Sequence, residues 1–311
     1  HDSCGVGFVA STDGKQRREV VQGGIDALKA VWHRGAVDAD GKTGDGAGIL
    51  TQIPYNFFDD EIAKTGHEKR DETLGIGMMF LPRNDYAALE KCRTIIESEL
   101  LDHGYYIYGW RQVPINNSVI GEKANSTRPE IEQVMFVNNI ERDKDFDFAK
   151  ELYLVRRRLE KRIAKQQING FYVCSLSFES IIYKGLFLAE QLSIFYPDLA
   201  NEEFISSFAV FHQRYSTNTF PSWGLAQPFR LLAHNGEINT ISGNTNWMRN
   251  HQTRITTEIF GDDSEQVKPI IEKNVSDSSA LDAAFELYVR AGRSVPLVKT
   301  LLMPEAWSKR S

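Results

Sequence analysis

Cys4-Gly5-Val6-Gly7-Phe8-Val9-Ala10 stands close to the start of the chain, and the fold prediction starts from it. A thiol followed by small residues and then by an apolar run predicts a short buried strand over residues 5–10. A cysteine at a chain terminus can use its own α-amino group as the base that forms the thiolate. Cys4 can also be a small apolar residue packed into this strand, so the segment alone leaves both roles open.

Beyond this strand, apolar residues recur with helical or strand-like spacing along the whole chain. The pattern predicts helices over residues 20–31, 86–101, 146–167, 246–256, 280–292 and 295–302. It predicts further strands over residues 49–53, 74–81, 105–113, 131–137, 171–178, 208–213 and 231–234. Because helices and strands do not alternate regularly, we expect an α+β layered sandwich and not a doubly wound α/β fold.

The composition narrows the class of protein. The chain has 311 residues, of which 41% are hydrophobic, so it can bury a substantial core. Its net charge of -6 gives no reason to expect a nucleic-acid partner. The longest apolar runs, such as Leu74–Pro82, are too short to span a bilayer. Three widely spaced cysteines and seven histidines without metal-site spacing predict neither a disulfide scaffold nor a metal site. We therefore expect a soluble protein of a reducing compartment, without membrane contact.

Three polar segments follow predicted strands or precede a helix. Arg214 ends an apolar strand and enters a run of hydroxyl and amide side chains, which suits a carboxylate ligand or a polar turn. Asn235-Gly236 is typical of a hairpin turn, but its amide and N–H groups can also stabilise an oxyanion. Asp277 can bind a substrate ammonium, although by itself the segment favours a role as helix cap.

These segments, in this order, resemble the class II glutamine amidotransferases, which are N-terminal-nucleophile hydrolases. The resemblance is greatest to the bacterial NADPH-type glutamate synthases and covers almost the whole chain. It is carried by Cys4–Ala10, Trp32–Ala36, Thr43–Leu50, Phe211–Thr219, His234–Ile238 and Met303–Trp307.

The resemblance implies a four-layer αββα sandwich and an activity, the hydrolysis of L-glutamine to glutamate and ammonia through a cysteinyl thioester. Cys4 would be the nucleophile, and Asn235 and the Gly236 N–H would hold the oxyanion. Arg214 would bind the substrate α-carboxylate. The resemblance assigns the remaining substrate-binding positions to Arg34, Thr217 and Asp277.

The resemblance also implies a domain organisation and partners. Residues 1–3 match the end of a propeptide, and residues 4–311 an amidotransferase domain that stops before its last strands. No cofactor is expected in this chain. The parent enzyme would use FMN, an iron–sulfur cluster and, with a small reductase subunit, FAD and NADPH. An inactive, unprocessed amidotransferase-fold domain and another class II amidotransferase are the alternative interpretations.

Overall fold

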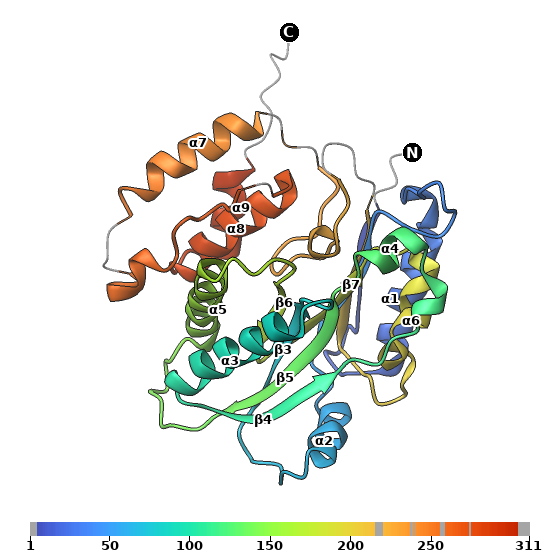
Figure 1. Cartoon of the computed structure of the whole chain (residues 1–311), viewed down its shortest axis with the longest axis horizontal. Coiled ribbons are helices and arrows are strands. Elements are labelled where there is room, and N and C mark those ends of the chain that lie inside the picture. The colour runs from blue at the N-terminus through green and yellow to red at the C-terminus, as the bar shows by residue number, and fades with distance from the viewer. Residues whose placement is uncertain are drawn as a thin grey trace. The chain divides into compact units, whose positions relative to one another are not determined.

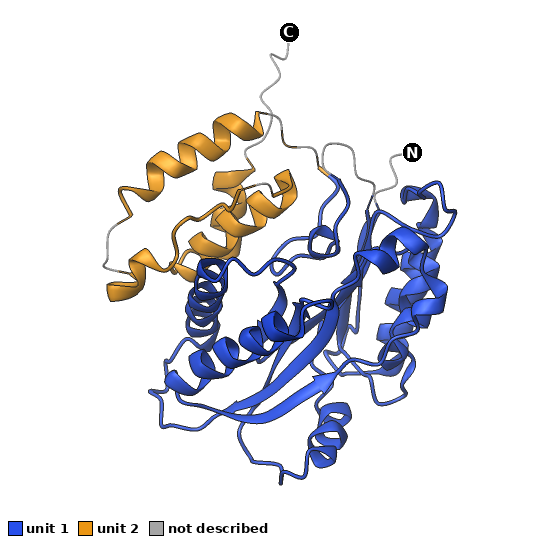
Figure 2. Cartoon of the chain, viewed as in Figure 1, with its two compact units in different colours: residues 1–235 blue, residues 236–311 orange. Residues whose placement is uncertain are grey.

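A computed structural model describes residues 5–214, 220–236, 238, 240–255, 259–273 and 275–303 of the chain (Figure 1). The chain divides into two compact units, residues 1–235 and residues 236–311 (Figure 2). The first unit contains both sheets, and the described part of the second unit is helical.

The first sheet has the strand order β1-β8-β2-β7, and its neighbouring strands are antiparallel. Its strands are β1 (Val6–Ala10), β2 (Ala47–Gln52), β7 (Ser180–Gly185) and β8 (Phe208–Gln213). In the β1–β8 register Val6 faces His212, and beyond it the Gln213 N–H donates to the Gly5 carbonyl at 2.6 Å. The pairing therefore brings the segment after Cys4 beside the residues that precede Arg214.

The second sheet has the strand order β4-β5-β3-β6 and is also antiparallel. Its strands are β3 (Leu74–Leu81), β4 (Tyr105–Gln112), β5 (Glu130–Asn138) and β6 (Tyr172–Ser177). Every residue of β3 is buried, because this central strand is covered on both faces.

Helices cover the two sheets on opposite sides of the first unit. Helix α1 (Arg18–Ala30) packs on the first sheet, where Gly24 lies against Ala209 and Ile49. Helices α3 (Tyr86–Asp102) and α5 (Phe148–Lys165) pack together on the second sheet (Figure 1). One hydrophobic cluster joins residues of α1 and both sheets, and a second joins α3, α5 and the other face of the second sheet. This order of helix, sheet, sheet and helices confirms the predicted α+β sandwich.

Shorter elements connect these layers. They are α2 (Tyr55–Lys64), α4 (Glu122–Ser126), α6 (Leu192–Phe195) and the 3₁₀ turn η1 (Trp32–Arg34). The sequence analysis did not predict α2 or strand β7, although both contain buried apolar residues.

Two predictions about strands were wrong in part or in whole. Strand β1 forms, but it is not fully buried, because the side chain of Phe8 is 75% exposed. Residues 231–234 form no strand: the His234 backbone is hydrogen-bonded to a side chain, and the Phe229 N–H donates to the Leu232 carbonyl in a turn. The apolar composition of the run is typical of a strand, but these hydrogen bonds join its backbone to a side chain and to a nearby residue, and not to a neighbouring strand.

The described part of the second unit contains three long helices. They are α7 (Ile241–Gln252), α8 (Asp277–Arg290) and α9 (Val295–Leu302). Helix α9 has the predicted range and α8 lies near its own, whereas α7 begins and ends several residues before the predicted range of 246–256. Helices α8 and α9 pack together, and the rings of His251 and Tyr288 lie 6.2 Å apart between α7 and α8. In neither unit does the described part of the chain contain a helix long and apolar enough to cross a membrane.

Candidate active site

The structure describes five of the seven residues predicted for the site, namely Arg34, Arg214, Asn235, Gly236 and Asp277. Cys4 and Thr217 lie outside the described residues. Gly5, the residue covalently bonded to Cys4, therefore marks the position from which the nucleophile's surroundings can be judged.

Gly5 is enclosed by three parts of the chain that are far apart in sequence. A Cβ atom built on Gly5 would lie 2.4 Å from the carbonyl oxygen of Gln213, 3.2 Å from Arg34 Cβ and 3.4 Å from Asn235 Nδ2. The first distance is shorter than any real contact, so only glycine fits here without moving the β8 backbone. The fold thus brings two predicted site residues, Arg34 and Asn235, to the residue that follows Cys4.

The end of strand β8 ties this region together. Gln213 is buried, and its Nε2 donates to the Gly46 carbonyl at 3.3 Å. The same amide leaves no room for a side chain on Gly35, whose Cβ would lie 2.3 Å from it. The Arg214 N–H donates to the Gly46 carbonyl at 2.8 Å. Strand β8 therefore fixes the 3₁₀ turn of Arg34 and the glycine-rich turn around Gly46 relative to Gly5.

The two arginines of the first unit differ in exposure. Arg214 is buried directly after β8. Arg34 ends η1 and is exposed, and within the described residues its guanidinium forms no hydrogen bond or ion pair. A free, exposed guanidinium can bind an incoming carboxylate or position an acyl group.

Asn235 is exposed, but the backbone of the preceding residue, His234, is hydrogen-bonded at both its N–H and its carbonyl. The His234 N–H donates to Gln227 Oε1 at 3.0 Å, and the His234 carbonyl accepts from Gln227 Nε2 at 3.1 Å. His212 Nε2 donates to the same carbonyl at 3.1 Å. Because a carbonyl oxygen can only accept, the Nε2 atom of His212 carries the proton.

The His212 ring is neutral in this position. Burial lowers the pKa of His212 to about 4, and the nearby His234 and Arg214 act in the same direction. Hydrogen bonds to the His234 carbonyl and to the Asn235 side chain act in the opposite direction but are weaker.

In the second unit, Asp277 is not the cap that its segment favoured. The Ser276 hydroxyl accepts from the Ser279 N–H at 3.1 Å and caps α8, while Asp277 occupies the first turn. Asp277 Oδ2 accepts from the Ile238 N–H at 3.1 Å, and Oδ1 accepts from the Ser278 N–H at 2.7 Å. The carboxylate therefore connects α8 to the segment that follows Gly236.

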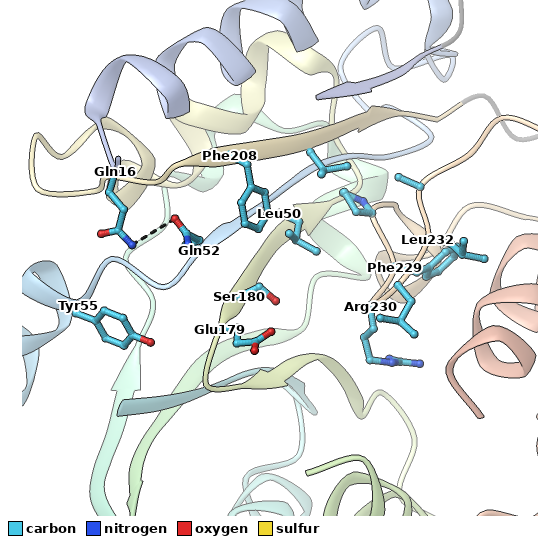
Figure 3. A pocket seen from close by; sticks show the side chains of 14 residues that line it. Gln16, Leu50, Gln52, Tyr55, Glu179, Ser180, Phe208, Phe229, Arg230 and Leu232 are labelled. Carbon is cyan, nitrogen blue, oxygen red and sulfur yellow. Dashed lines mark hydrogen bonds between the residues drawn. The ribbon is translucent and has the colours of Figure 1, made fainter. Parts of the chain in front are cut away.

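A cavity of about 520 Å³ lies on the face of the first sheet that carries Leu50 and Val210 (Figure 3). The segment from Pro228 to Ala233 forms one wall, with Phe229, Arg230 and Leu232 on that side (Figure 3). None of the five described site residues lines this cavity. Its wall is nevertheless the loop between Gln227 and His234, so the cavity and the Asn235 position share one loop.

No role was predicted from the sequence for Gln213, His212 or Gln227. Gln213 and His212 lie in a segment that carried the resemblance, but their contacts connect residues far apart in sequence. Gln227 gave no signal, because its partner is a backbone seven positions away in an irregular loop.

Comparison with known proteins identifies the family. The family model "Glutamine amidotransferases class-II" matches residues 4–311. Over 98% of its length the chain is 61% identical to the glutamate synthase [NADPH] large chain of Azospirillum brasilense. It is 42% identical, again over 98%, to the chloroplastic ferredoxin-dependent glutamate synthase of Spinacia oleracea. Over 100% of its length it is 40% identical to the glutamate synthase [NADPH] large chain of Bacillus subtilis.

The chain spans about one fifth of the length of these relatives, with 20%, 19% and 20% of them covered. From this match and from the α+β sandwich, the chain belongs to the class II glutamine amidotransferase family.

Proposed function

We propose that this chain hydrolyses L-glutamine to glutamate and ammonia as the ammonia-supplying domain of a glutamate synthase. The observation that carries the proposal is the surroundings of Gly5. Arg34 and Asn235, predicted from separate segments, both lie against the residue bonded to Cys4. A thiol nucleophile and an amide oxyanion donor serve acyl transfer from an amide, and a guanidinium can bind a carboxylate of the substrate.

The proposed reaction begins at the Cys4 thiolate. Its sulfur attacks the side-chain carbonyl carbon of glutamine, a C–S bond forms, and the carbonyl oxygen takes the negative charge. Asn235 Nδ2 and the Gly236 N–H stabilise this oxyanion. Where one such donor has been removed from an enzyme, kcat fell by about 100- to 1,000-fold.

Collapse of the tetrahedral intermediate breaks the C–N bond. The leaving nitrogen takes a proton from the Cys4 α-amino group, which received it from the thiol, and departs as ammonia. Water then attacks the thioester carbonyl carbon, a C–O bond forms, and the same amino group takes the water proton. The C–S bond breaks, the sulfur takes that proton from the amino group, and glutamate leaves. This role requires a free α-amino group, and we propose that residues 1–3 are removed on maturation.

The remaining predicted residues would bind the substrate. Arg214 would bind the α-carboxylate, and Asp277 would bind the α-ammonium. Arg34 would support the acyl group, and Thr217 would complete the pocket. The charges are complementary to a zwitterionic amino acid, and a guanidinium favours a planar carboxylate.

The cofactors of the whole enzyme fit other parts of the parent protein better than this chain. We propose FMN and an iron–sulfur cluster elsewhere in the same polypeptide, with FAD and NADPH bound through a small reductase subunit in the cytoplasm. Cys92 and Cys174 do not suit an iron–sulfur cluster, since they are buried in different hydrophobic clusters. Burial raises the pKa of the Cys92 thiol to about 11 and that of Cys174 to about 12, which disfavours thiolate ligands.

The test combines intact mass, labelling and turnover. A chain whose mass begins at Cys4 should take up one equivalent of diazo-oxo-norleucine. In a separate, unlabelled sample the same chain should release glutamate and ammonia from glutamine in equal amounts. Cys4→Ala should abolish both, whereas Cys92→Ala, a matched change at a buried thiol, should retain both. A correctly matured chain that neither labels nor hydrolyses glutamine would refute the proposal.

A further inference from the structure

We infer that Gln227 is a positioning residue for the oxyanion donor Asn235, acting through the backbone of His234. This inference rests on the proposed function, in which Asn235 stabilises the oxyanion. Gln227 lies in none of the segments that carried the resemblance and touches none of the predicted site residues in the hydrogen bonds described.

The amide of Gln227 fixes His234 at both ends. Its Oε1 accepts from the His234 N–H at 3.0 Å, and its Nε2 donates to the His234 carbonyl at 3.1 Å. The carbonyl belongs to the peptide bond that joins His234 to Asn235, so the donor controls the orientation of that peptide plane. Asn235 itself is exposed and lies outside any helix or strand, so regular backbone pairing does not hold it.

The Gln227 side chain is itself preorganised. The residue is only 4% exposed, and the backbone carbonyl oxygen of Gln227 lies where a side chain on Gly48 of β2 would be, 2.5 Å from the built Cβ. One residue earlier, the buried Lys184 ammonium donates to the Ala226 carbonyl at 2.8 Å and to the Gly224 carbonyl at 2.9 Å. Strands β2 and β7 thus hold the backbone from which Gln227 reaches His234.

An amide is suited to this role because it donates and accepts in one plane. His212 supplies a second donor to the His234 carbonyl but cannot accept from its N–H through the same atom. A carboxylate at position 227 would accept from the N–H but would place a negative oxygen against the carbonyl. A protonated carboxyl group has one donor and one acceptor, so it would restore the amide pattern.

This difference gives a pH signature that a purely structural role lacks. In the mature chain, Gln227→Glu should lower kcat for glutamine hydrolysis by about 10- to 100-fold at about pH 8, with KM changed far less. The ratio of variant to wild-type kcat should rise toward one as the pH falls to about 5.5, since the introduced carboxyl group takes up a proton. Circular dichroism at each pH establishes that both proteins are folded.

A matched control and a double-mutant cycle separate the possible outcomes. Gln191 is also buried, and its amide likewise accepts from the Leu188 N–H at 2.8 Å and donates to the Lys42 carbonyl at 3.0 Å. Gln191→Glu should leave kcat within about twofold at every pH. In an Asn235→Ala background, Gln227→Glu should have no further effect on kcat, because the group it positions is gone.

The two proposals fail in different ways. If Asn235→Ala leaves kcat unchanged, the assignment of the oxyanion donor fails and this inference fails with it. If Asn235→Ala lowers kcat but Gln227→Glu does not, or lowers it equally in the Asn235→Ala background, only the positioning role of Gln227 is overturned. The same holds if Gln227→Glu lowers kcat by a constant factor at all pH values.

Discussion

Lowering the pH from about 7 to about 5 should destabilise the first compact unit by about 2 kcal/mol through His212 alone. The side chain of His212 is 1% exposed, and burial lowers its pKa from 6.5 to about 4. The neutral form is therefore favoured in the folded state. Its contribution to stability is complete above the unfolded pKa and is lost as the pH falls toward the folded one.

The magnitude follows from the two pKa values. The full difference between them corresponds to about 3 kcal/mol of free energy of unfolding. About 2 kcal/mol of this is lost between about pH 7 and about pH 5, because the unfolded chain takes up the proton over this range and the folded chain does not. Carboxylates contribute mainly at lower pH, so this window isolates histidine.

The assay is urea unfolding at several pH values, followed by circular dichroism, for the wild type and His212→Gln. The glutamine amide can donate to the His234 carbonyl, but it does not titrate. His212→Gln should therefore show a shallower fall in stability, and the gap between the two curves should close by about 2 kcal/mol toward pH 5. Parallel curves over the whole range would refute the assignment of a neutral, buried His212.

Three further predictions concern stability and are measured by urea or thermal unfolding at neutral pH. Gly24→Ala should destabilise the fold although alanine favours helix, because the new Cβ would lie 2.7 Å from its neighbour on β8. Gly23→Ala is the control: its nearest contact is at 3.5 Å, and it should stabilise the fold by up to about 1 kcal/mol. Equal effects of the two changes would contradict the packing of α1. Asp198→Ala should lower the free energy of unfolding by about 3–5 kcal/mol, because the buried Arg111 loses this partner. Arg111 donates to both carboxylate oxygens of Asp198, at 2.7 and 2.8 Å. A loss under about 1 kcal/mol would contradict a buried ion pair. Ser276→Ala should cost about 1 kcal/mol by removing the cap of α8, and an unchanged stability would show that the cap contributes nothing.

Periodicity predicted the layers of the fold well, because each covering helix has one apolar face and the strands contain apolar runs. Helices α1, α3 and α9 and strands β3 and β8 lie within a residue or two of the predicted ranges. The failure at residues 231–234 has a physical cause. An apolar composition indicates that a run can be buried, but it does not indicate which groups pair with its backbone. Here the backbone of His234 is hydrogen-bonded to a side chain and not to a strand.

The candidate site was likewise predicted only in part. The resemblance named Arg34 and Asn235, and the structure brings both to Gly5. It named none of the groups that hold them. Gln213 and Gln227 act through side chain to backbone bonds that span long or irregular stretches, and such bonds leave no periodic pattern in one sequence.

Burial explains why the positioning groups are polar glutamine and histidine side chains and not apolar ones. Asn235 and Arg34 are exposed, and so they cannot be fixed by packing alone. A buried hydrogen bond fixes direction as well as distance, and it is costly to break because the freed partner stays buried. The buried Gln227 directs the backbone beside Asn235 in this way, and the buried Gln213 is bonded to the backbone of Gly46. It follows that apolar replacements of similar size at these two positions should preserve the fold better than they preserve turnover.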